Sequence, residues 1–378
     1  MKVSGPINIV RLEGTINNIH KIVYLFMDIH VPPNIQTECE EVDVLPVKYY
    51  IITTLQKYHK IDPHKVFDIF IEVSSKKIKS SSNKSSNYID SMKQFYLREN
   101  KVLSNARIHY IDAREIIFMK SINIIFDIPS VFRDFFDNNI WKSYLAAVQY
   151  VLDEINVIYE DIFINKKSNN KIVDKIINSY DNKFIKKKIN DIFDIELKEN
   201  AYNTFKTLNE NYNKLKNIYN YLNKNIFTKY DINQIDNILI PDYYIDGLGT
   251  YGGLTTKLIN EINICTVLIS EKLVEIILLD IFGLHIMDMY VLRRLLDKNN
   301  ITNILIYTGK HHSINCIYRL VKDFNFMVTH ASYINEKSIK KVNNIIKNKN
   351  NFQEISYLFT PNILHQCSDL SNFPENFS

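Results

Sequence analysis

The sequence predicts an α/β protein with a central, mainly parallel sheet that is flanked by helices and carries a helical insertion. Three observations lead to this fold class. Short apolar runs end on charged or polar residues, a helix-like stretch separates the first two runs, and a long block of polar, helix-patterned sequence precedes the last one. The order strand, helix, strand is typical of parallel sheets. With 378 residues, of which 46% are hydrophobic, the chain can bury a large core.

The N-terminal half of the α/β core is expected at residues 1–128. It holds apolar runs that close on charged residues, as buried parallel strands do where they meet their loops. These runs are residues 21–28, 66–73 and 107–114. Residues 46–60 are predicted to form a helix between the first two runs, and the Ser-, Lys- and Asn-rich residues 74–91 are predicted to form a loop.

A helical insertion is expected at residues 129–235, where apolar residues recur at spacings of three and four. The C-terminal half of the core follows at residues 236–348. It contains a glycine-bearing loop, two helices and a final β-branched strand at 301–309, which a further helix follows directly. Residues 349–378 carry weak periodicity and two prolines, so they are predicted to pack as an irregular tail.

Polar groups of catalytic type stand at the end of each predicted strand. These groups are Asp28 and His30, Glu72, Asp112 and Arg114, and Gly309 with His311 and His312. Because the carboxyl ends of parallel strands meet at one edge of a sheet, we expect these side chains to converge there. Carboxylates and imidazoles at such an edge suit a divalent metal ion or general acid–base chemistry. The alternative is structural, since every strand that reaches a loop meets polar residues.

Single residues of this group allow more than one interpretation. Asp28 and His30 alternate along an extended chain, so both could face one ion. A lone histidine such as His30 also serves well to cap a helix or to bond a buried carbonyl. Glu72 stands among apolar neighbours, where an unpaired carboxylate is unfavourable, so it requires either a function or a salt bridge, for which Arg114 is the candidate partner.

The two adjacent histidines after the last strand are expected to differ. His312 completes a Gly-x-x-His pattern and is preferred for the site, whereas His311 could face solvent. The predicted metal ligands are His30, Glu72, His312 and His311. The predicted catalytic residues are Asp28, Glu72, Asp112 and Arg114.

Charge, hydropathy and cysteine spacing narrow the class of protein. A net charge of +4, from 46 basic and 42 acidic residues, does not favour nucleic acid as a partner. The longest apolar stretches are interrupted by charges, so neither membrane insertion nor secretion is expected. Four cysteines stand far apart without a CxxC pair, which argues against a zinc ribbon and a disulfide framework and favours a reducing, cytoplasmic location. Cys39 and Cys316 are candidate nucleophiles. The alternative, which is commoner for cysteine, is that each is buried and inert.

The strand-end motifs resemble one superfamily. They read LFMDIH at 25–30, FDIFIE at 67–72, IHYIDAR at 108–114 and YTGKHH at 307–312. This pattern resembles the superfamily that joins TraB/TIKI proteins, erythromycin esterases and ChaN-like haem-binding proteins. The resemblance implies an α/β fold with a helical insertion and a metal-dependent or general-base hydrolytic site that uses His30, Glu72 and His312. Met27 departs from the pattern, because the first motif of the superfamily has glycine there, and Asp28 departs from the Glu-x-His of the esterases.

We therefore predict a metal-dependent hydrolase that acts on a small molecule or a peptide and holds a divalent ion. One alternative is a non-enzymatic virion-associated or host-interaction protein that retains this fold, in the host cytoplasm or the virion. The Ile-, Asn-, Lys- and Tyr-rich composition is typical of AT-rich genomes such as those of large DNA viruses. Another alternative is a metallophosphoesterase of the calcineurin type, whose Asp-x-His motif is present while its central motifs are missing. A homo-oligomer or a virion protein remains open as partner.

Overall fold

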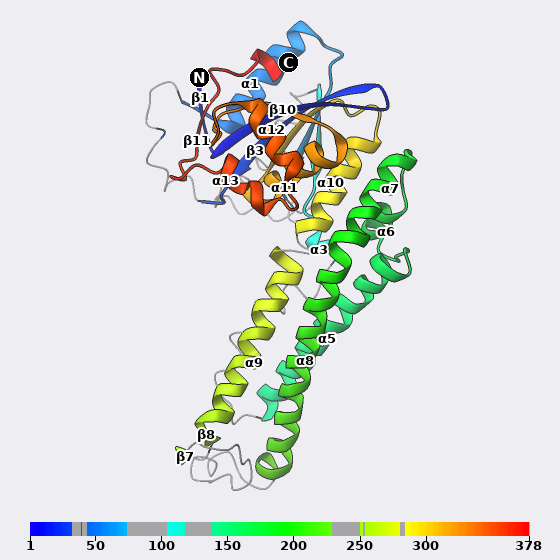
Figure 1. The fold of residues 1–378 in the computed structure, drawn as a ribbon, viewed down its shortest axis with the longest axis vertical. Coiled ribbons are helices and arrows are strands. Elements are labelled where there is room, and N and C mark those ends of the chain that lie inside the picture. The colour runs from blue at the N-terminus through cyan, green and yellow to red at the C-terminus, as the bar shows by residue number, and fades with distance from the viewer. Residues whose placement is uncertain are drawn as a thin grey trace. The chain divides into compact units, whose positions relative to one another are not determined.

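The computed structural model describes residues 1–31, 39, 44–73, 104–117, 138–228, 250–251, 254–279 and 284–377. The chain forms two compact units (Figure 1). The core unit comprises residues 1–113, 180–188 and 287–378, and the helical unit comprises residues 114–179 and 189–286. The predicted fold class, α/β with a mainly parallel sheet and a helical insertion, is confirmed. The predicted loop at 74–91 lies outside the described residues. Of the predicted glycine-bearing loop, residues 243–256, the structure describes only residues 250–251 and 254–256.

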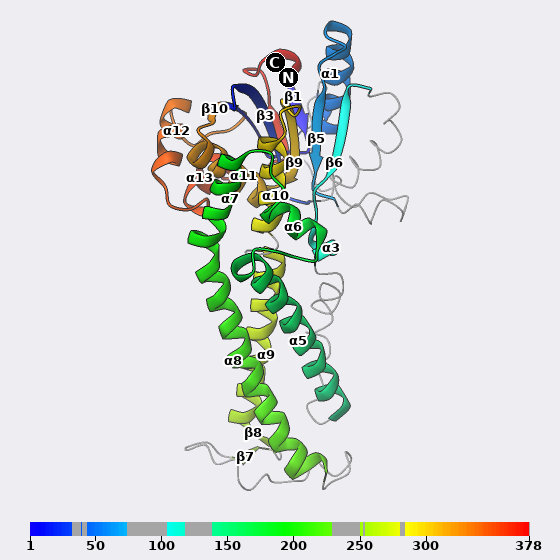
Figure 2. The same ribbon diagram turned by 90° about the vertical axis from the view of Figure 1, so that its right-hand side faces the viewer.

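A six-stranded mixed sheet forms the centre of the core unit, in the order β10-β2-β3-β9-β5-β6 (Figure 2). Its strands are β2 (Asn8–Ile16), β3 (Ile19–Asp28), β5 (Phe67–Ile71), β6 (Ala106–Tyr110), β9 (Asn303–Gly309) and β10 (Met327–Ala331). Strands β3, β9, β5 and β6 are parallel to one another, and they correspond to the apolar runs of the sequence. Strands β2 and β10 extend the sheet antiparallel beyond β3.

Strand β9 lies between β3 and β5 and is buried along its whole length. Its Ile-, Leu- and Tyr-rich sequence fits this position, because a central parallel strand is covered by helices on both faces. In the ladders, Asp28 of β3 is opposite Gly309 of β9, and Ile71 of β5 is opposite Tyr307. This register brings the carboxyl ends of three strands to nearly the same level.

Helices cover both faces of the sheet. They are α1 (Val47–Ile61), α10 (Ile286–Asp297), α11 (Lys310–Phe324), α12 (Ile339–Asn348) and α13 (Ser356–Phe359). Ile51 and Leu55 of α1 pack in one buried cluster with Ile69 of β5. Side chains alternate along a strand, so Phe70 points to the opposite face. There it stacks on His109, which is hydrogen-bonded to an arginine of α10.

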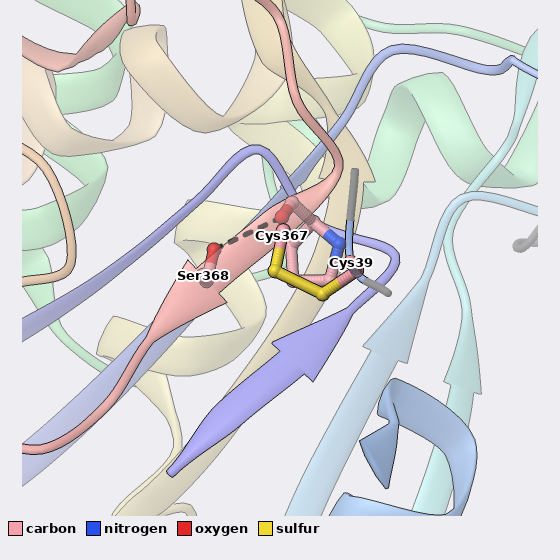
Figure 3. The surroundings of a disulfide bond; sticks show 4 residues. Cys39, Cys367 and Ser368 are labelled. Carbon is pink, nitrogen blue, oxygen red and sulfur yellow. Dashed lines mark hydrogen bonds between the residues drawn. A yellow bond between two sulfur atoms is a disulfide. The ribbon is translucent and has the colours of Figure 1, made fainter. Parts of the chain in front are cut away.

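A small three-stranded sheet, ordered β11-β1-β4, joins both ends of the chain. Its strands are β1 (Lys2–Ser4), β4 (Leu45–Pro46) and β11 (Cys367–Asp369). A disulfide between Cys39 and Cys367, whose Cα atoms lie 5.5 Å apart, ties β11 to the segment that follows β3 (Figure 3). The cysteine spacing argues against a disulfide framework, and this single bond is therefore one that the sequence does not predict. The two cysteines are separated by 328 residues, so their spacing in the sequence carries no sign of their contact.

The helical unit is dominated by long helices. Its helices are α3 (Arg114–Ile117), α5 (Asn138–Tyr159), α6 (Lys171–Ile177), α8 (Lys198–Leu222) and α9 (Thr256–Val274), and α7 (Lys183–Ile192) begins in the core unit and ends in the helical one. Short π-helical turns follow several of them, at Glu160–Ile164, Phe193–Leu197, Asn223–Phe227 and Glu275–Leu279, and strands β7 (Thr250–Tyr251) and β8 (Leu254–Thr255) precede α9. Helix α8 packs between α5 and α9, and both views show the three side by side (Figures 1 and 2). In the described ranges, no helix has the length and apolar character needed to cross a membrane.

Candidate functional site

The carboxyl ends of β3, β9 and β5 bring together three of the predicted positions. The backbone amide of Glu72 donates to the carbonyl of Tyr307 at 3.1 Å, which continues the β5–β9 pairing one residue past the end of β5. The backbone N–H of Gly309 in turn donates to Oε2 of Glu72 at 2.7 Å. Since Gly309 is also opposite Asp28 in the β3–β9 ladder, the two carboxylates flank the end of the central strand.

Gly309 allows the polar groups to approach each other closely. A β-carbon at this position would lie 2.7 Å from Nε2 of His30 and 3.3 Å from Oε2 of Glu72. The first separation is too short for any contact of a carbon atom, so a larger residue would displace the His30 ring. The glycine of the Gly-x-x-His pattern thus provides space at the site.

His312 lies in the first turn of α11, which begins directly after β9. Its Nδ1 atom is 2.8 Å from Oδ1 of Asp288 in α10, and its Nε2 atom is 3.4 Å from Oε1 of Glu72. Burial alone would lower the pKa of His312, but the charges of Glu72 and Asp288 outweigh it and raise the pKa to about 10. The ring is therefore a buried imidazolium at neutral pH, held between two carboxylates.

Asp28 is fully buried at the end of β3. Its Oδ1 atom accepts hydrogen bonds from the backbone amides of Ile29 and His30, at 2.8 and 3.2 Å, and from the side-chain amide of Gln366 at 2.7 Å. Its Oδ2 atom has no hydrogen-bond partner in the described part of the chain. Burial raises the pKa of this carboxyl above its usual value, and the neighbouring His30 opposes that shift.

His30 is the exposed member of the group. The side chain is 45% exposed, and its Nδ1 and Nε2 atoms lie 3.7 Å from Oδ2 of Asp28 and 3.9 Å from Oε2 of Glu72. Its backbone has a φ of 58°, in the left-handed region that residues other than glycine seldom adopt. The turn after β3 thus directs this imidazole back over the strand ends.

The remaining predicted residues are His311, Asp112 and Arg114. His311 is exposed, in contrast to the buried His312. Asp112 follows β6, and its backbone amide donates to the carbonyl of Val73 at 3.4 Å, next to Glu72 in the chain. Arg114 is the first residue of α3 and belongs to the helical unit. Catalytic roles for Asp112 and Arg114 and a ligand role for His311 stay predictions. Glu38, Glu40 and Glu41 follow the first predicted strand in the sequence and could add a carboxylate to the site, but they lie outside the described residues.

Two residues that sequence reasoning did not select complete the group. Asp288 holds Nδ1 of His312, and its Oδ2 atom accepts from the side-chain amide of Asn315 at 2.7 Å. Gln366 holds Asp28. The sequence around Asp288 could have indicated a buried role, because this carboxylate stands between apolar residues at the start of α10. Gln366 stands in the C-terminal tail without any pattern around it.

Of the predicted metal ligands, His30 and His312 both lie beside Glu72. Among the residues that the structure describes, no group of three or more His, Cys, Asp or Glu side chains is arranged to hold a metal ion. The Asp288 contact leaves Nε2 of His312 as the atom that faces Glu72, which is how carboxylate-bound histidine ligands are commonly oriented. A ligand role for His30, Glu72 and His312 accordingly stays a prediction.

The cysteines considered as nucleophiles are not suited to that role. Cys39 is bonded to Cys367 in the disulfide. Cys316 is fully buried in α11, and burial raises the pKa of its thiol well above the usual value. Since the thiolate is the nucleophilic form, Cys316 is an inert core residue at neutral pH.

Fold and site together define an α/β protein with a carboxylate–imidazole cluster at the carboxyl edge of a parallel sheet. The chain matches the "Family of unknown function (DUF5847)" over residues 1–172 and 163–378 and belongs to that family. Relatives occur in a giant virus, Acanthamoeba polyphaga mimivirus, which agrees with the expected relation to large DNA viruses. The uncharacterized protein R161 is 30% identical over 100% of this chain and 98% of its own length, and R706 is 30% identical over 99% and 96%. No solved structure matches the chain.

Proposed function

We propose that this protein is a hydrolase whose site is the cluster of Asp28, His30, Glu72 and His312. The observation that carries the proposal is the position of the Glu72 carboxylate, 3.9 Å from the exposed His30 ring and 3.4 Å from the buried His312 ring. Two imidazoles of different exposure beside one carboxylate provide both a ring that solvent can reach and a buried positive charge.

The two histidines take different parts in the proposed reaction. The exposed His30 ring, next to Asp28 and Glu72, accepts a proton from a water molecule that attacks the substrate, and later returns that proton to the leaving group. His312 stays protonated through its contact with Asp288, and its charge stabilises the negative charge that develops on the attacked group. The substrate class is a small molecule or a peptide with an ester or amide bond.

Metal dependence is a separate part of the proposal. A divalent ion held by His30, Glu72 and His312 would supply Lewis-acid chemistry and lower the pKa of the attacking water. The side chains as they lie do not surround one point, and histidine binds metals only without its second proton, so no step above is assigned to an ion. The strand-end motifs resemble those of TraB/TIKI proteins, erythromycin esterases and ChaN-like proteins. This resemblance supports a hydrolase and is compatible with both a metal-dependent and a metal-independent reaction.

The first experiment compares metal content and hydrolysis in the wild type and a His30→Ala/His312→Ala variant. Elemental mass spectrometry on both proteins shows whether a stoichiometric ion depends on the two rings. Hydrolysis of p-nitrophenyl acetate, of p-nitrophenyl phosphate and of a peptide mixture is then followed with and without a chelator. Activity that is lost in the variant supports the hydrolase. A wild type without metal and without hydrolysis would contradict it and favour a virion-associated or host-interaction protein.

A further inference from the structure

The C-terminal tail reaches the candidate site through one side chain. Gln366 is buried, and its Nε2 atom donates to Oδ1 of Asp28 at 2.7 Å across a sequence separation of 338 residues. The other amide atom, Oε1, has no hydrogen-bond partner in the described residues, so the contact with Asp28 is what orients the amide. The backbone carbonyl of Gln366 accepts from the amide of Gly5 at 2.9 Å.

The disulfide lies at the next residue along the chain. Cys367 pairs with Ser4 at the start of the antiparallel contact between β11 and β1, and its sulfur is bonded to Cys39. Ser368 lies beside the disulfide (Figure 3). Its hydroxyl donates to the carbonyl of Pro6 at 2.9 Å. Strand β11 has three residues, and a pairing of that length is weak without further support.

The disulfide ties together the two chain segments that meet at Asp28. Cys39 follows the site residues Asp28 and His30 in the first segment, and Cys367 follows Gln366 in the last. We infer that Gln366 is a positioning residue for Asp28 and that the Cys39–Cys367 disulfide keeps it in place, so that the site is fully assembled only in the oxidised protein. The structural part of this inference is independent of the reaction, and its effect on catalysis rests on the proposed function.

The geometry at Asp28 explains why a positioning residue is required. Oδ1 accepts from two adjacent backbone amides and from Gln366, which fixes the plane of the carboxylate. Oδ2 is then left 3.7 Å from Nδ1 of His30, facing the ring without a hydrogen bond of its own in the described residues. Without Gln366 the backbone amides of Ile29 and His30 still donate to Oδ1. The Asp28 carboxylate then loses the one described hydrogen bond that reaches it from the C-terminal tail and limits its rotation.

Reduction supplies a specific way to release this contact. A dithiol attacks one sulfur of the disulfide and forms a mixed disulfide, and its second thiol then displaces the remaining sulfur. Two electrons pass to the protein, Cys39 and Cys367 become thiols, and the dithiol is oxidised to its own disulfide. Strand β11 then keeps its backbone pairing with β1 and the hydrogen bond of Ser368 to Pro6, but it loses its covalent link to the first segment, so Gln366 leaves Asp28 more often.

Hydrogen–deuterium exchange on the full chain tests the structural part. Mass spectrometry first establishes whether the Cys39–Cys367 bond forms in purified protein. Exchange is then compared at residues 21–30 and 361–373 for the wild type, the wild type in dithiothreitol, a Cys39→Ser/Cys367→Ser variant and a Gln366→Leu variant. We expect exchange at both segments to become at least about fivefold faster in the reduced and doubly substituted proteins, while the rest of the sheet stays protected. In Gln366→Leu, faster exchange is expected at residues 21–30 while the disulfide remains.

Controls separate positioning from a general loss of stability. Gln353→Leu changes an exposed glutamine of the same tail and should leave both segments as in the wild type. Diethylpyrocarbonate labelling of His30, mapped by mass, should rise in Gln366→Leu and not in Gln353→Leu. The inference is wrong if the disulfide does not form, or if reduction and Gln366→Leu leave exchange at residues 21–30 and His30 labelling unchanged.

Kinetics tests the catalytic consequence separately. Once a hydrolysed substrate is known, Gln366→Leu should lower kcat by between about tenfold and a hundredfold with little change in KM, because it displaces Asp28 without touching substrate. A change in KM alone would overturn the positioning role. If no substrate is hydrolysed by the wild type but exchange responds as expected, the proposed hydrolase fails while the disulfide-dependent assembly of the Asp28 contact stands.

Discussion

The Nδ1 atom of His312 lies 2.8 Å from Oδ1 of Asp288, and this contact determines the charge of the site. The carboxylate belongs to α10 and the ring to α11, on either side of the central strand β9 in the sequence. Because Asp288 and Glu72 both face the buried ring, the imidazolium is favoured despite its burial. The proposed roles follow from the contact between Asp288 and His312: His312 supplies a fixed positive charge, and the exposed His30 transfers the proton.

Neutralising Asp288 should weaken the fold. Asp288→Asn keeps the size of the side chain and removes the charge that holds the His312 ring, so we expect the free energy of unfolding to fall by about 1–3 kcal/mol at pH 7. Urea denaturation followed by circular dichroism measures this change. Asp194→Asn, which alters an exposed ion pair with Lys166, is the matched control and should stay within about 0.5 kcal/mol of the wild type. Equal effects of both substitutions would contradict a special role for Asp288.

The stability that His312 contributes should disappear at high pH. Its pKa is raised to about 10 in the folded protein, above the value of about 6.5 for an unfolded histidine. The folded state therefore binds an extra proton between these values, and the stabilisation is complete below about pH 6.5 and lost as pH rises through about 10. Unfolding free energies of the wild type and His312→Gln at pH 6, 8 and 10 should converge with increasing pH. A constant difference would show that the ring is not charged in the fold.

Glu72 should be required for activity far more than for stability. Glu72→Gln retains an oxygen that can accept from the Gly309 amide, but removes the negative charge between the two rings. We expect hydrolysis of a responsive substrate to fall by about 10²–10⁴-fold, the usual contribution of one acid–base group. Thermal unfolding monitors the fold in parallel. Full activity in this variant would remove Glu72 from the mechanism.

The sheet glycines Gly309 and Gly14 should respond differently to alanine. At Gly309 the new β-carbon meets the His30 ring, which is partly exposed and can turn away, so we expect stability to change by less than about 1 kcal/mol and activity to fall. At Gly14 the β-carbon would lie 2.4 Å from the ring of Phe326, which is fully buried, so a loss of about 1–3 kcal/mol is expected. Urea denaturation of both variants, with His30 labelling by diethylpyrocarbonate, checks this contrast. A large destabilisation by Gly309→Ala would mean that His30 cannot move.

The Asp68 network should make the core sensitive to acid. Burial tends to raise the pKa of Asp68, but hydrogen bonds from His109 and Arg107, at 2.7 Å and at 2.6–2.8 Å, outweigh it and leave the pKa lowered. A lowered carboxylate pKa contributes stability above the unfolded value of about 3.9, and this is lost as pH falls through the folded pKa. Asp68→Asn should therefore be less stable than the wild type at pH 7, with the difference shrinking below about pH 4. A pH-independent difference in urea denaturation would argue against the charged network.

Local sequence patterns were sufficient to predict the strands of the parallel sheet. Residues 67–71, 106–110 and 303–309 form strands within or close to the predicted apolar runs, because buried parallel strands need continuous apolar side chains on both faces. The parallel order then implied that polar groups at their ends share one edge, and Asp28, Glu72 and Gly309 do lie there. The sequence does not predict the antiparallel strands β2 and β10. Their polar and apolar residues are mixed, so no apolar run sets them apart from a loop.

What the sequence by itself determined is the type of fold and the edge of the sheet where carboxylates and imidazoles gather. Only the tertiary structure decided which partners these groups have. Asp288 and Gln366 reach the site from segments that are distant along the chain, and Cys39 and Cys367 join across 328 residues. The physical reason is the range of the interactions. Hydrophobic periodicity is encoded within a few neighbouring residues, whereas hydrogen bonds, charges and disulfides depend on distances that exist only after the sheet has brought its strand ends together.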